Sequence, residues 1–552
     1  MKPKQIISLA LLTLINVQVP GVMHAAESAR GKAPIFDGLG KHHYPITTTS
    51  KKAQRYFDQG LTLCYGFNHP EAIRSFRAAL HHDPECAMAY WGIAYASGPH
   101  VNRPMEPEDN TRAWEAIQKA LALKSKLTEL EKAMIDAMAT RYIEEFKPDR
   151  ADLDKAFAVA MRDVTRRFPD DMDAQTIFAE ALMDTMPWDY WLKDRSPKPE
   201  TEEAFAALRT VLKRNPDHPG ATHYYIHAVE AGPNPELGLP SADRLMHIAP
   251  QAGHLVHMPS HIYMRVGQYE DAEIANIKAV KADRSYIRSC AAQGFYPGVY
   301  YPHNEHFLWY AQLFQGRSAD ALKTANKTAQ IAPDNYCGPN KALEAPRLRH
   351  LPWLTQARFG RWNEVLSVPK PAATNDFLID RAMWHFVRGL ALVAQSNSQT
   401  AAIESAELTR LVGSEEAKQL DAPTFPAIGI LTVAQHWLAA RVADAEGKTD
   451  EAIEHFKKAV AAEDALPYME PAFWPIPVRP ALGALYLKSG RHEEAEKTFR
   501  EDLSLWPRNI WGLYGLKESL LRQGRSESAE IVGLEFERAS KRADVKVKLE
   551  WF

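Results

Sequence analysis

Residues 71–84 read EAIRSFRAALHHDP, and within this stretch Ala72, Phe76, Ala79 and Pro84 decide the fold. The first three recur at steps of four and three residues, so they share one face of a helix, and the proline that follows ends it. The same order of small and large residues returns near the other end of the chain, at Leu482, Gly483, Tyr486, Ala495, Phe499 and Pro507. A pattern that returns in one phase predicts a repeat protein.

Further copies of the pattern occupy the middle of the chain. They are marked by Tyr263, Gly267 and Ala272, by Gly316, Ala321 and Pro333, and by Gly447, Ala452, Phe456 and Ala459. The pattern resembles the tetratricopeptide repeat, a helix–turn–helix unit of about 34 residues, with small residues where the two helices touch and large ones where they interlock. The resemblance covers most of residues 54–529, with insertions and some degenerate copies.

The resemblance implies an all-α fold, an α-solenoid of stacked helix–turn–helix repeats. A single helical pair cannot bury its apolar face, so neighbouring pairs must stack around one continuous core. We therefore expect one array rather than the several domains that 552 residues would otherwise suggest. The expected parts are an extension at 26–52, N-terminal repeats at 53–218, histidine-rich central repeats at 219–380, C-terminal repeats at 381–540 and a tail at 541–552.

The tail alternates apolar and charged residues over 544–552. This pattern suits a short strand or an extended segment, and a disordered terminus is the other interpretation.

The composition is that of a soluble folded protein, with 45% apolar residues, 24% charged residues and a formal net charge of −3. No basic excess is present to hold a phosphate backbone, so we expect no nucleic-acid partner. Four cysteines without a CxxC pair exclude a disulfide-stapled scaffold. Helix geometry separates Cys64 from Cys86, so we expect this pair to be free, whereas a disulfide between Cys290 and Cys337 stays open.

The first 25 residues have the features of a secretory signal. Lys2 and Lys4 precede an apolar stretch over residues 6–19, and the small residues Ala25 and Ala26 offer a cleavage site. The apolar stretch is too short to span a bilayer. We therefore predict a signal peptide at 1–25, a periplasmic or secreted protein, and no transmembrane anchor in the mature chain.

Histidines gather in the central repeats, where nine of the 21 lie between His218 and His306. The resemblance implies that certain places on the first helix of each repeat line a concave groove, and these places share one helix face. His350 takes such a place as well, whereas His218 and His247 do not. The candidate metal ligands at these places are His223, His227, Glu230, His254, His257, His261, His303 and His306.

These side chains have the chemistry of a metal site. Residues three or four apart on a helix have Cβ atoms about 5–6 Å apart, and packed helices lie about 8–10 Å apart, so rings from successive repeats can converge. Imidazole nitrogen is a preferred ligand of such ions, often with a carboxylate or water completing the shell. We therefore predict a divalent transition metal (Zn, Fe or Cu) in the groove and leave metal-assisted chemistry open.

Other interpretations stay open beside the metal site. The histidines could be hydrogen-bonded groove walls, or the groove could bind a peptide, a protein or another small-molecule ligand as a metal-free interaction module. The aromatic insertions at 187–199 and 285–301 could cover a ligand or only cap helix ends. The chain has no glycine-rich phosphate loop, no CxxCH haem motif and no GxSxG motif, so we expect no nucleotide or haem cofactor and name no catalytic residue.

Overall fold

The structure is a computed structural model that describes residues 33–192, 194–292, 294–332, 348–371 and 377–552. The predicted signal peptide at 1–25 and Cys337 lie outside these residues. The described chain is built of helices, and its β pairing is limited to three isolated bridges. The expected all-α fold is confirmed. In this part of the chain no helix is long and apolar enough to cross a bilayer.

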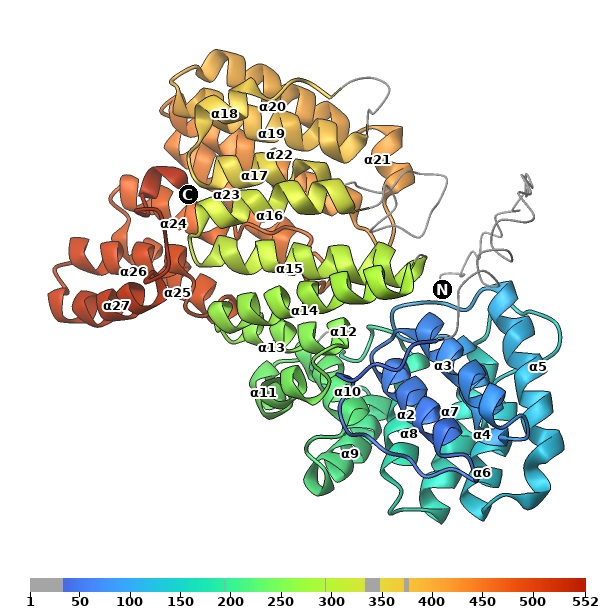
Figure 1. Cartoon of the computed structure of the whole chain (residues 1–552). Helices are drawn as coiled ribbons and strands as arrows, with labels where there is room; N and C mark the ends of the chain where they lie inside the picture. The colour runs from blue at the N-terminus through green and yellow to red at the C-terminus, as the bar shows by residue number, and fades with distance from the viewer. Residues whose placement is uncertain (1–32, 193, 293, 333–347, 372–376) are drawn as a thin grey trace, which may run out of the picture.

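The N-terminal helices form one end of the molecule, drawn in blue to teal in Figure 1. They are α2 (Lys51–Tyr65), α3 (His69–His82), α4 (Ala87–Ser97), α5 (Pro107–Leu123), α6 (Glu129–Ala139), α7 (Ala151–Arg167), α8 (Met172–Asp184) and α9 (Pro199–Arg214), with a 3₁₀ turn at Lys124–Lys126.

The central helices, mainly green in Figure 1, lead from that end to the other. They are α10 (Pro219–Glu230), α11 (Leu239–Ile248), α12 (Gly253–His257), α13 (Pro259–Arg265), α14 (Tyr269–Cys290), α15 (Tyr301–Phe314), α16 (Ser318–Ile331), α17 (Leu351–Arg358) and α18 (Trp362–Ser367). Short 3₁₀ turns at Pro235–Gly238 and Leu348–His350 and a π-helical turn at Tyr296–Tyr300 join them.

The C-terminal helices complete the array. They are α19 (Leu378–Ala394), α20 (Ser398–Val412), α21 (Glu415–Leu420), α22 (Ala427–Ala445), α23 (Thr449–Asp464), α24 (Arg479–Lys488), α25 (His492–Leu505), α26 (Ile510–Arg522) and α27 (Ser526–Ala539), followed by a 3₁₀ turn at Leu549–Trp551.

The repeats pack by the alternation of small and large residues that the sequence predicts. A Cβ atom built on Gly60 of α2 or on Gly92 of α4 would lie 2.6 Å from the ring of Phe76 in α3. Gly483 of α24 meets Phe499 of α25 at the same distance. Because only glycine permits this approach, one aromatic ring locks neighbouring helices together, and the stacking makes the continuous core of a solenoid.

The turn between the two helices of a repeat holds a left-handed residue two places before the second helix begins. Phe67 (φ 54°) and Ser396 (φ 61°) occupy this place in two repeats. A left-handed conformation costs a residue with a side chain roughly 1–2 kcal/mol, so a bulky side chain at Phe67 calls for a compensating contact. In six other turns the place is taken by glycine, which has no such penalty, at Gly267, Gly316, Gly360, Gly447, Gly490 and Gly524.

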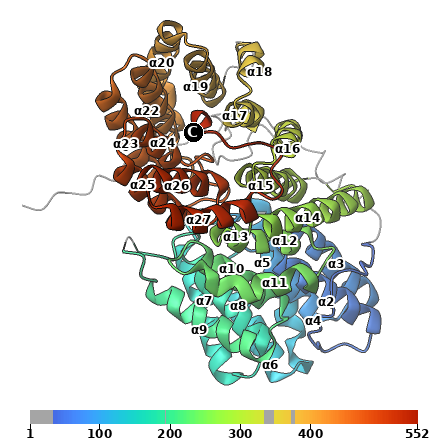
Figure 2. The same cartoon turned by 90° about the vertical axis from the view of Figure 1, so that its left-hand side faces the viewer.

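The C-terminal repeats fold back onto the central ones. Figure 2 shows the red helices α25–α27 next to the green helix α13. The hydroxyl of Tyr269 donates to the carbonyl of Pro507 at 2.8 Å, and the indole of Trp511 donates to the carbonyl of Leu313 at 3.3 Å. These contacts join segments about two hundred residues apart, so the C-terminal repeats pack against the central repeats.

The tail packs against the repeats without forming a strand. The carboxylate of Asp544 accepts hydrogen bonds from the backbone N–H groups of Ser318 and Ala319, at 2.7 and 2.9 Å, and so caps α16. Phe552 is buried, with its ring centroid 5.8 Å from that of Trp511. A strand and a disordered terminus are therefore both wrong for this segment.

The described cysteines are free. Cys64 and Cys86 are both buried thiols, as we expect from helix geometry. Cys290 is also free among the described residues, and its pairing with Cys337 stays a prediction.

Candidate metal centre

The predicted ligands come from four helices of the central repeats. Helix α10 carries three of them at steps of four and three, so they face one way. Helices α12 and α13, joined through Met258, carry three more, and α15 carries two. These sets are His223, His227 and Glu230; His254, His257 and His261; and His303 and His306.

These side chains do not line an open groove, and in this respect the expectation is wrong. All of them are buried except His303, which is partly exposed. Two segments pack across the rings. Phe67, in the turn after α2, stacks on them from one side, and Glu470, in the loop before α24, reaches His261 at 3.3 Å from another. The fold-back of the repeats turns the predicted groove into an interior.

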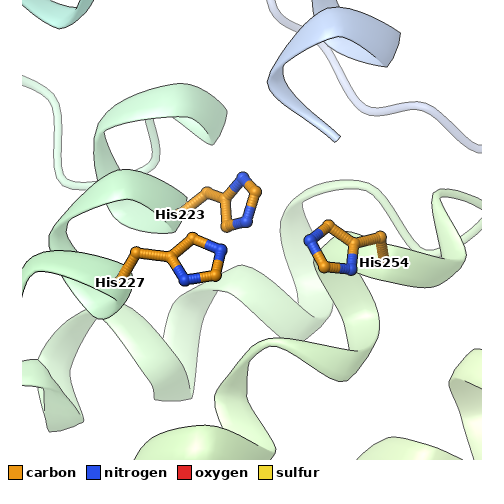
Figure 3. Close-up of side chains that lie close together, drawn as sticks. All are labelled: His223, His227 and His254. Atoms are coloured by element: carbon orange, nitrogen blue, oxygen red, sulfur yellow. The ribbon is translucent and has the colours of Figure 1, made fainter. Parts of the chain in front are cut away.

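The first cluster consists of His223, His227 and His254, which we call the first triad. Each residue offers one ring nitrogen, and the three nitrogens lie within 4.8 Å of one another. Figure 3 shows the two rings of α10 facing His254. The centroid of the His223 ring lies 4.8 Å from that of His227 and 4.9 Å from that of His254. Nitrogens that share one ion lie at most about 4 Å apart, so small ring rotations would close the set.

Hydrogen bonds on the outer side of the first triad define which ring nitrogens carry hydrogen. Nδ1 of His223 donates to the carbonyl of Tyr65 at 2.6 Å, and Nδ1 of His227 donates to Oε1 of Glu230 at 2.8 Å. A neutral imidazole has only one N–H, so Nε2 of each ring is a bare lone pair. Neither Nε2, nor either ring nitrogen of His254, has a hydrogen-bond partner among the described residues.

The electrostatics around His223 and His254 favour neutral rings. Burial, and next the neighbouring His227, lower the pKa of His223 well below its usual value. Burial, and next His223, do the same for the pKa of His254. A neutral imidazole is the form that coordinates a metal ion.

Glu230 links the first triad to a second set of histidines. Its Oε1 accepts from His227, and its Oε2 accepts from Nδ1 of His261. Burial alone would raise the pKa of Glu230, but these two rings outweigh burial and lower it to about 2. With each oxygen facing a ring N–H, the carboxylate orients two histidines, and its role as a ligand stays a prediction. A carboxylate behind a ligating histidine is the usual arrangement at metal sites.

The second cluster consists of His257, His261 and His303, which we call the second triad. One ring nitrogen of each lies within 4.8 Å of the others. The Nε2 atoms of His257 and His261 are 2.9 Å apart. Nδ1 of His257 donates to Oδ1 of Asn276 at 2.6 Å.

His306 joins neither triad. Its ring stacks on Trp309, with centroids 5.4 Å apart, and burial together with the nearby His350 lowers its pKa to about 3. The reason is the helix period of α15. One full turn after His303 comes Phe307, whose ring contacts His257 and His261, so Phe307 and not His306 continues the inward face.

Phe67 is a residue of the site that the sequence analysis missed. Its ring lies against the first triad, with centroids 4.6 Å from His223 and 5.4 Å from His254, and against the buried His100 at 4.5 Å. These contacts are the compensation for its left-handed backbone. The available signal is an aromatic residue at a turn place where other repeats carry glycine.

Each of the two aromatic insertions places an aromatic ring against a histidine of the first triad. Trp188, which is partly exposed, approaches the ring of His227 edge-on at 5.4 Å, and its indole donates to Asn102 at 3.1 Å. Tyr300, from the π-helical turn, lies over His254 with centroids 4.3 Å apart. Of the two interpretations of these insertions, covering of the histidine site therefore fits.

A third histidine cluster, also missed, surrounds Asp173 at the start of α8. Its Oδ1 accepts from Nε2 of His42 at 2.8 Å and from the hydroxyl of Tyr65 at 2.6 Å, and Nε2 of His218 faces it at 3.4 Å. Nδ1 of His218 accepts the backbone N–H of Ala221, so its Nε2 carries the hydrogen. We call these residues the Asp173 network.

Asp173 and His42 each favour the charged form of the other. Burial opposes ionisation of Asp173, but the neighbouring His42 and His218 outweigh burial and hold the pKa of Asp173 well below its usual value. Burial would lower the pKa of His42, and Asp173 raises it instead. The network thus ties the extension before α2 to α8 and to the start of α10, through two hydrogen bonds to Asp173 and the approach of His218.

Two family models match the chain, both described as tetratricopeptide repeat, at residues 57–97 and 481–510. The matches fall on the stretches around Phe76 and Phe499 from which the repeat phase can be read. No curated protein matches the chain significantly in sequence.

Solved structures that a comparison finds similar to this chain share little of its sequence. The human IFIT1 dimer with PPP-AAAA is 12% identical with a TM-score of 0.30, covering 90% of this chain and 92% of that one. Yeast Tom70 is 14% identical with a TM-score of 0.28, covering 90% and 93%. The Rap protein complexed with Competence and Sporulation Factor is 11% identical with a TM-score of 0.31, covering 75% and 98%. Similarity at this level does not identify a ligand for this chain.

Proposed function

We propose that this chain, a tetratricopeptide-repeat protein, is an exported scaffold whose interior holds a divalent transition-metal ion between His223, His227 and His254. The observation that carries the proposal is the first triad with its bare lone pairs. Two rings have their N–H groups bound on the outer side, which leaves each Nε2 buried and without a partner in the described part of the chain. Unpaired buried polar atoms are costly, and a bound cation would take up the lone pairs of His223 and His227 together with one nitrogen of His254.

The donor set indicates the class of ion. Neutral imidazole suits zinc, copper, iron and nickel, whereas magnesium and calcium prefer oxygen ligands. Three protein ligands are typical of sites that keep a further position for water or a substrate. The first triad is therefore compatible with metal-assisted chemistry, in which the ion would activate a bound water.

The repeats themselves make the chain a protein-interaction scaffold, because stacked helical pairs present extended surfaces. A metal-free interaction module is the function that would remain if no ion binds. The buried histidines favour the metal-binding function, since a peptide in a groove would need those rings to be accessible.

Export is the second part of the proposal and rests on the sequence of residues 1–25. The basic start, the apolar stretch and the small residues at its end are typical of a cleaved signal. Mass measurement of the protein recovered from the periplasm or medium should give a chain that starts near Ala26. Retention of the full-length chain in the cytoplasm would contradict export and leave metal binding untouched.

Elemental analysis of the purified protein tests the metal site. We expect a transition metal in stoichiometric amount, with one ion per chain fewer in the double variant His223→Gln with His227→Gln. His247→Gln, at an exposed histidine of the same repeats, is the matched control and should keep the metal. Chelation should lower the melting temperature of the wild type by more than that of the double variant, because an ion that binds only the folded state stabilises it. A metal-free protein that zinc, copper and iron salts fail to reconstitute would overturn the proposal.

A further inference from the structure

The second triad contains a contact that hydrogen bonds within the chain do not explain. Nε2 of His257 lies 2.9 Å from Nε2 of His261, the distance of a hydrogen bond. A hydrogen bond requires that one of the two nitrogens carries hydrogen. The partners on the opposite sides of both rings decide whether this is so.

The partner of His257 requires its hydrogen on the outer nitrogen. The amide Nδ2 of Asn276 donates to the carbonyl of Ala272 at 2.8 Å, which fixes the orientation of that amide. Oδ1 of Asn276 therefore faces Nδ1 of His257 as an acceptor, at 2.6 Å. Nδ1 of His257 must donate, so Nε2 of the neutral ring is a lone pair.

The partner of His261 also requires the hydrogen of that ring on its outer nitrogen, Nδ1. Its Nδ1 faces Oε2 of Glu230, a carboxylate that can only accept. Nε2 of His261 is then a lone pair too, and two lone pairs oppose each other at hydrogen-bond distance. A cation between the rings removes the conflict.

We propose that a second divalent transition-metal ion binds between His257, His261 and His303, so that the interior holds two neighbouring ions. The proposal builds on the proposed function, because the first triad holds the other ion. His303 completes the set from α15, with a ring nitrogen within 4.8 Å of those of the other two. Its partial exposure gives this second site a route to solvent.

The two triads are adjacent and share one carboxylate. The ring centroids of His227 and His261 are 5.9 Å apart, and those of His254 and His257 are 5.8 Å apart. Glu230 accepts the N–H of one ring from each triad, through its two oxygens. A single buried negative charge therefore supports both ions, and a change at Glu230 affects both.

Counting ions in single-triad variants tests the proposal. The full-length protein is stripped with chelator, loaded with excess Zn²⁺, desalted, and its zinc content is measured per chain. We expect two ions in the wild type, one in His223→Gln, one in His303→Gln and none in the variant with both changes. His306→Gln, at the other α15 histidine, is the matched control and should keep two.

The outcomes separate this proposal from the proposed function. One ion in the wild type that His303→Gln leaves in place would overturn the second site and keep the first. One ion that either variant removes would mean a single shared site and overturn the two-ion arrangement. No ion at all would overturn both proposals.

A spectroscopic measurement keeps the test decisive if a variant binds weakly. With Cu²⁺ in place of zinc, two neighbouring copper ions should couple magnetically and reduce the electron paramagnetic resonance signal per copper. The His303→Gln protein should restore the signal of an isolated ion. A wild-type spectrum of uncoupled copper at full intensity, with two ions bound, would contradict the adjacency.

Discussion

The first triad and the Asp173 network are two histidine clusters separated by a single residue, Tyr65. The hydroxyl of Tyr65 donates to Asp173, and its carbonyl accepts the N–H of His223. In the network, the hydrogens of the rings point inward at a carboxylate. In the triad, the hydrogens of His223 and His227 point outward and their lone pairs point inward. The comparison teaches that the partner of the outer nitrogen, and not the number of histidines, determines what a cluster can bind.

The backbone supplies this difference at the start of α10 and one turn into it. Nδ1 of His218, which precedes the helix, accepts a backbone N–H from Ala221, so its other nitrogen donates. Nδ1 of His223 donates to a backbone carbonyl, so its other nitrogen is free to coordinate. The start of α10 provides a backbone N–H group that donates to His218. The end of α2 provides a backbone carbonyl that accepts from His223.

The largest expected effect concerns the Asp173 network. Asp173→Asn removes the buried charge that His42 and His218 face, and breaking a buried charged pair costs about 3–5 kcal/mol. We expect the free energy of unfolding to fall by about 3 kcal/mol, measured by urea unfolding of metal-free protein, while zinc stoichiometry stays the same. Asp170→Asn, at an exposed carboxylate beside α8, should change stability by less than about 0.5 kcal/mol. Loss of zinc in Asp173→Asn would show that the two clusters are one site.

The next effect concerns Glu230, which stands behind both triads. Glu230→Gln keeps the shape but removes the charge that orients His227 and His261. Residues in this position change metal affinity by about 10–100-fold, so we expect zinc to bind that much more weakly in competition with a chelating dye. Glu236→Gln, on the exposed surface beyond α10, is the control. Equal affinity in the two variants would place Glu230 outside the metal site.

The smallest effect is the acid dependence of the Asp173 network. Because the pKa of Asp173 is lower in the folded than in the unfolded chain, its contribution to stability is complete above its unfolded pKa of about 3.9 and is lost as the pH falls. We expect the stability difference between the wild type and Asp173→Asn to shrink below pH 4 by at most about 1.4 kcal/mol per pH unit. Denaturation at several acidic pH values measures it. A difference that stays constant to pH 2 would contradict the charged network.

Much of the fold follows from the sequence because each repeat is specified locally. The spacing around Phe76 and Phe499 predicts helical pairs that the structure contains, and the small residues meet these rings as expected. The spacing of His223 and His227 likewise places both on one face of α10. Short-range periodicity is sufficient for these features.

The closure of the site could not be predicted in the same way, because it depends on contacts between distant segments. Glu470 reaches His261 from more than two hundred residues away, and Phe67 packs on the triad from the first repeat. The phase of a repeat predicts which face of its helix a side chain lies on. It does not predict which distant segment packs against that face. His306 shows the finer limit, since an insertion precedes α15 and a small shift of phase puts Phe307 in its place.

The tail that caps α16 has a consequence for how the protein is made. Asp544 supplies its two hydrogen bonds to a helix start that lies 226 and 225 residues earlier in the chain. During synthesis, that helix emerges from the ribosome long before its cap exists. The start of α16 therefore stays uncapped until the ribosome has synthesised the tail that contains Asp544.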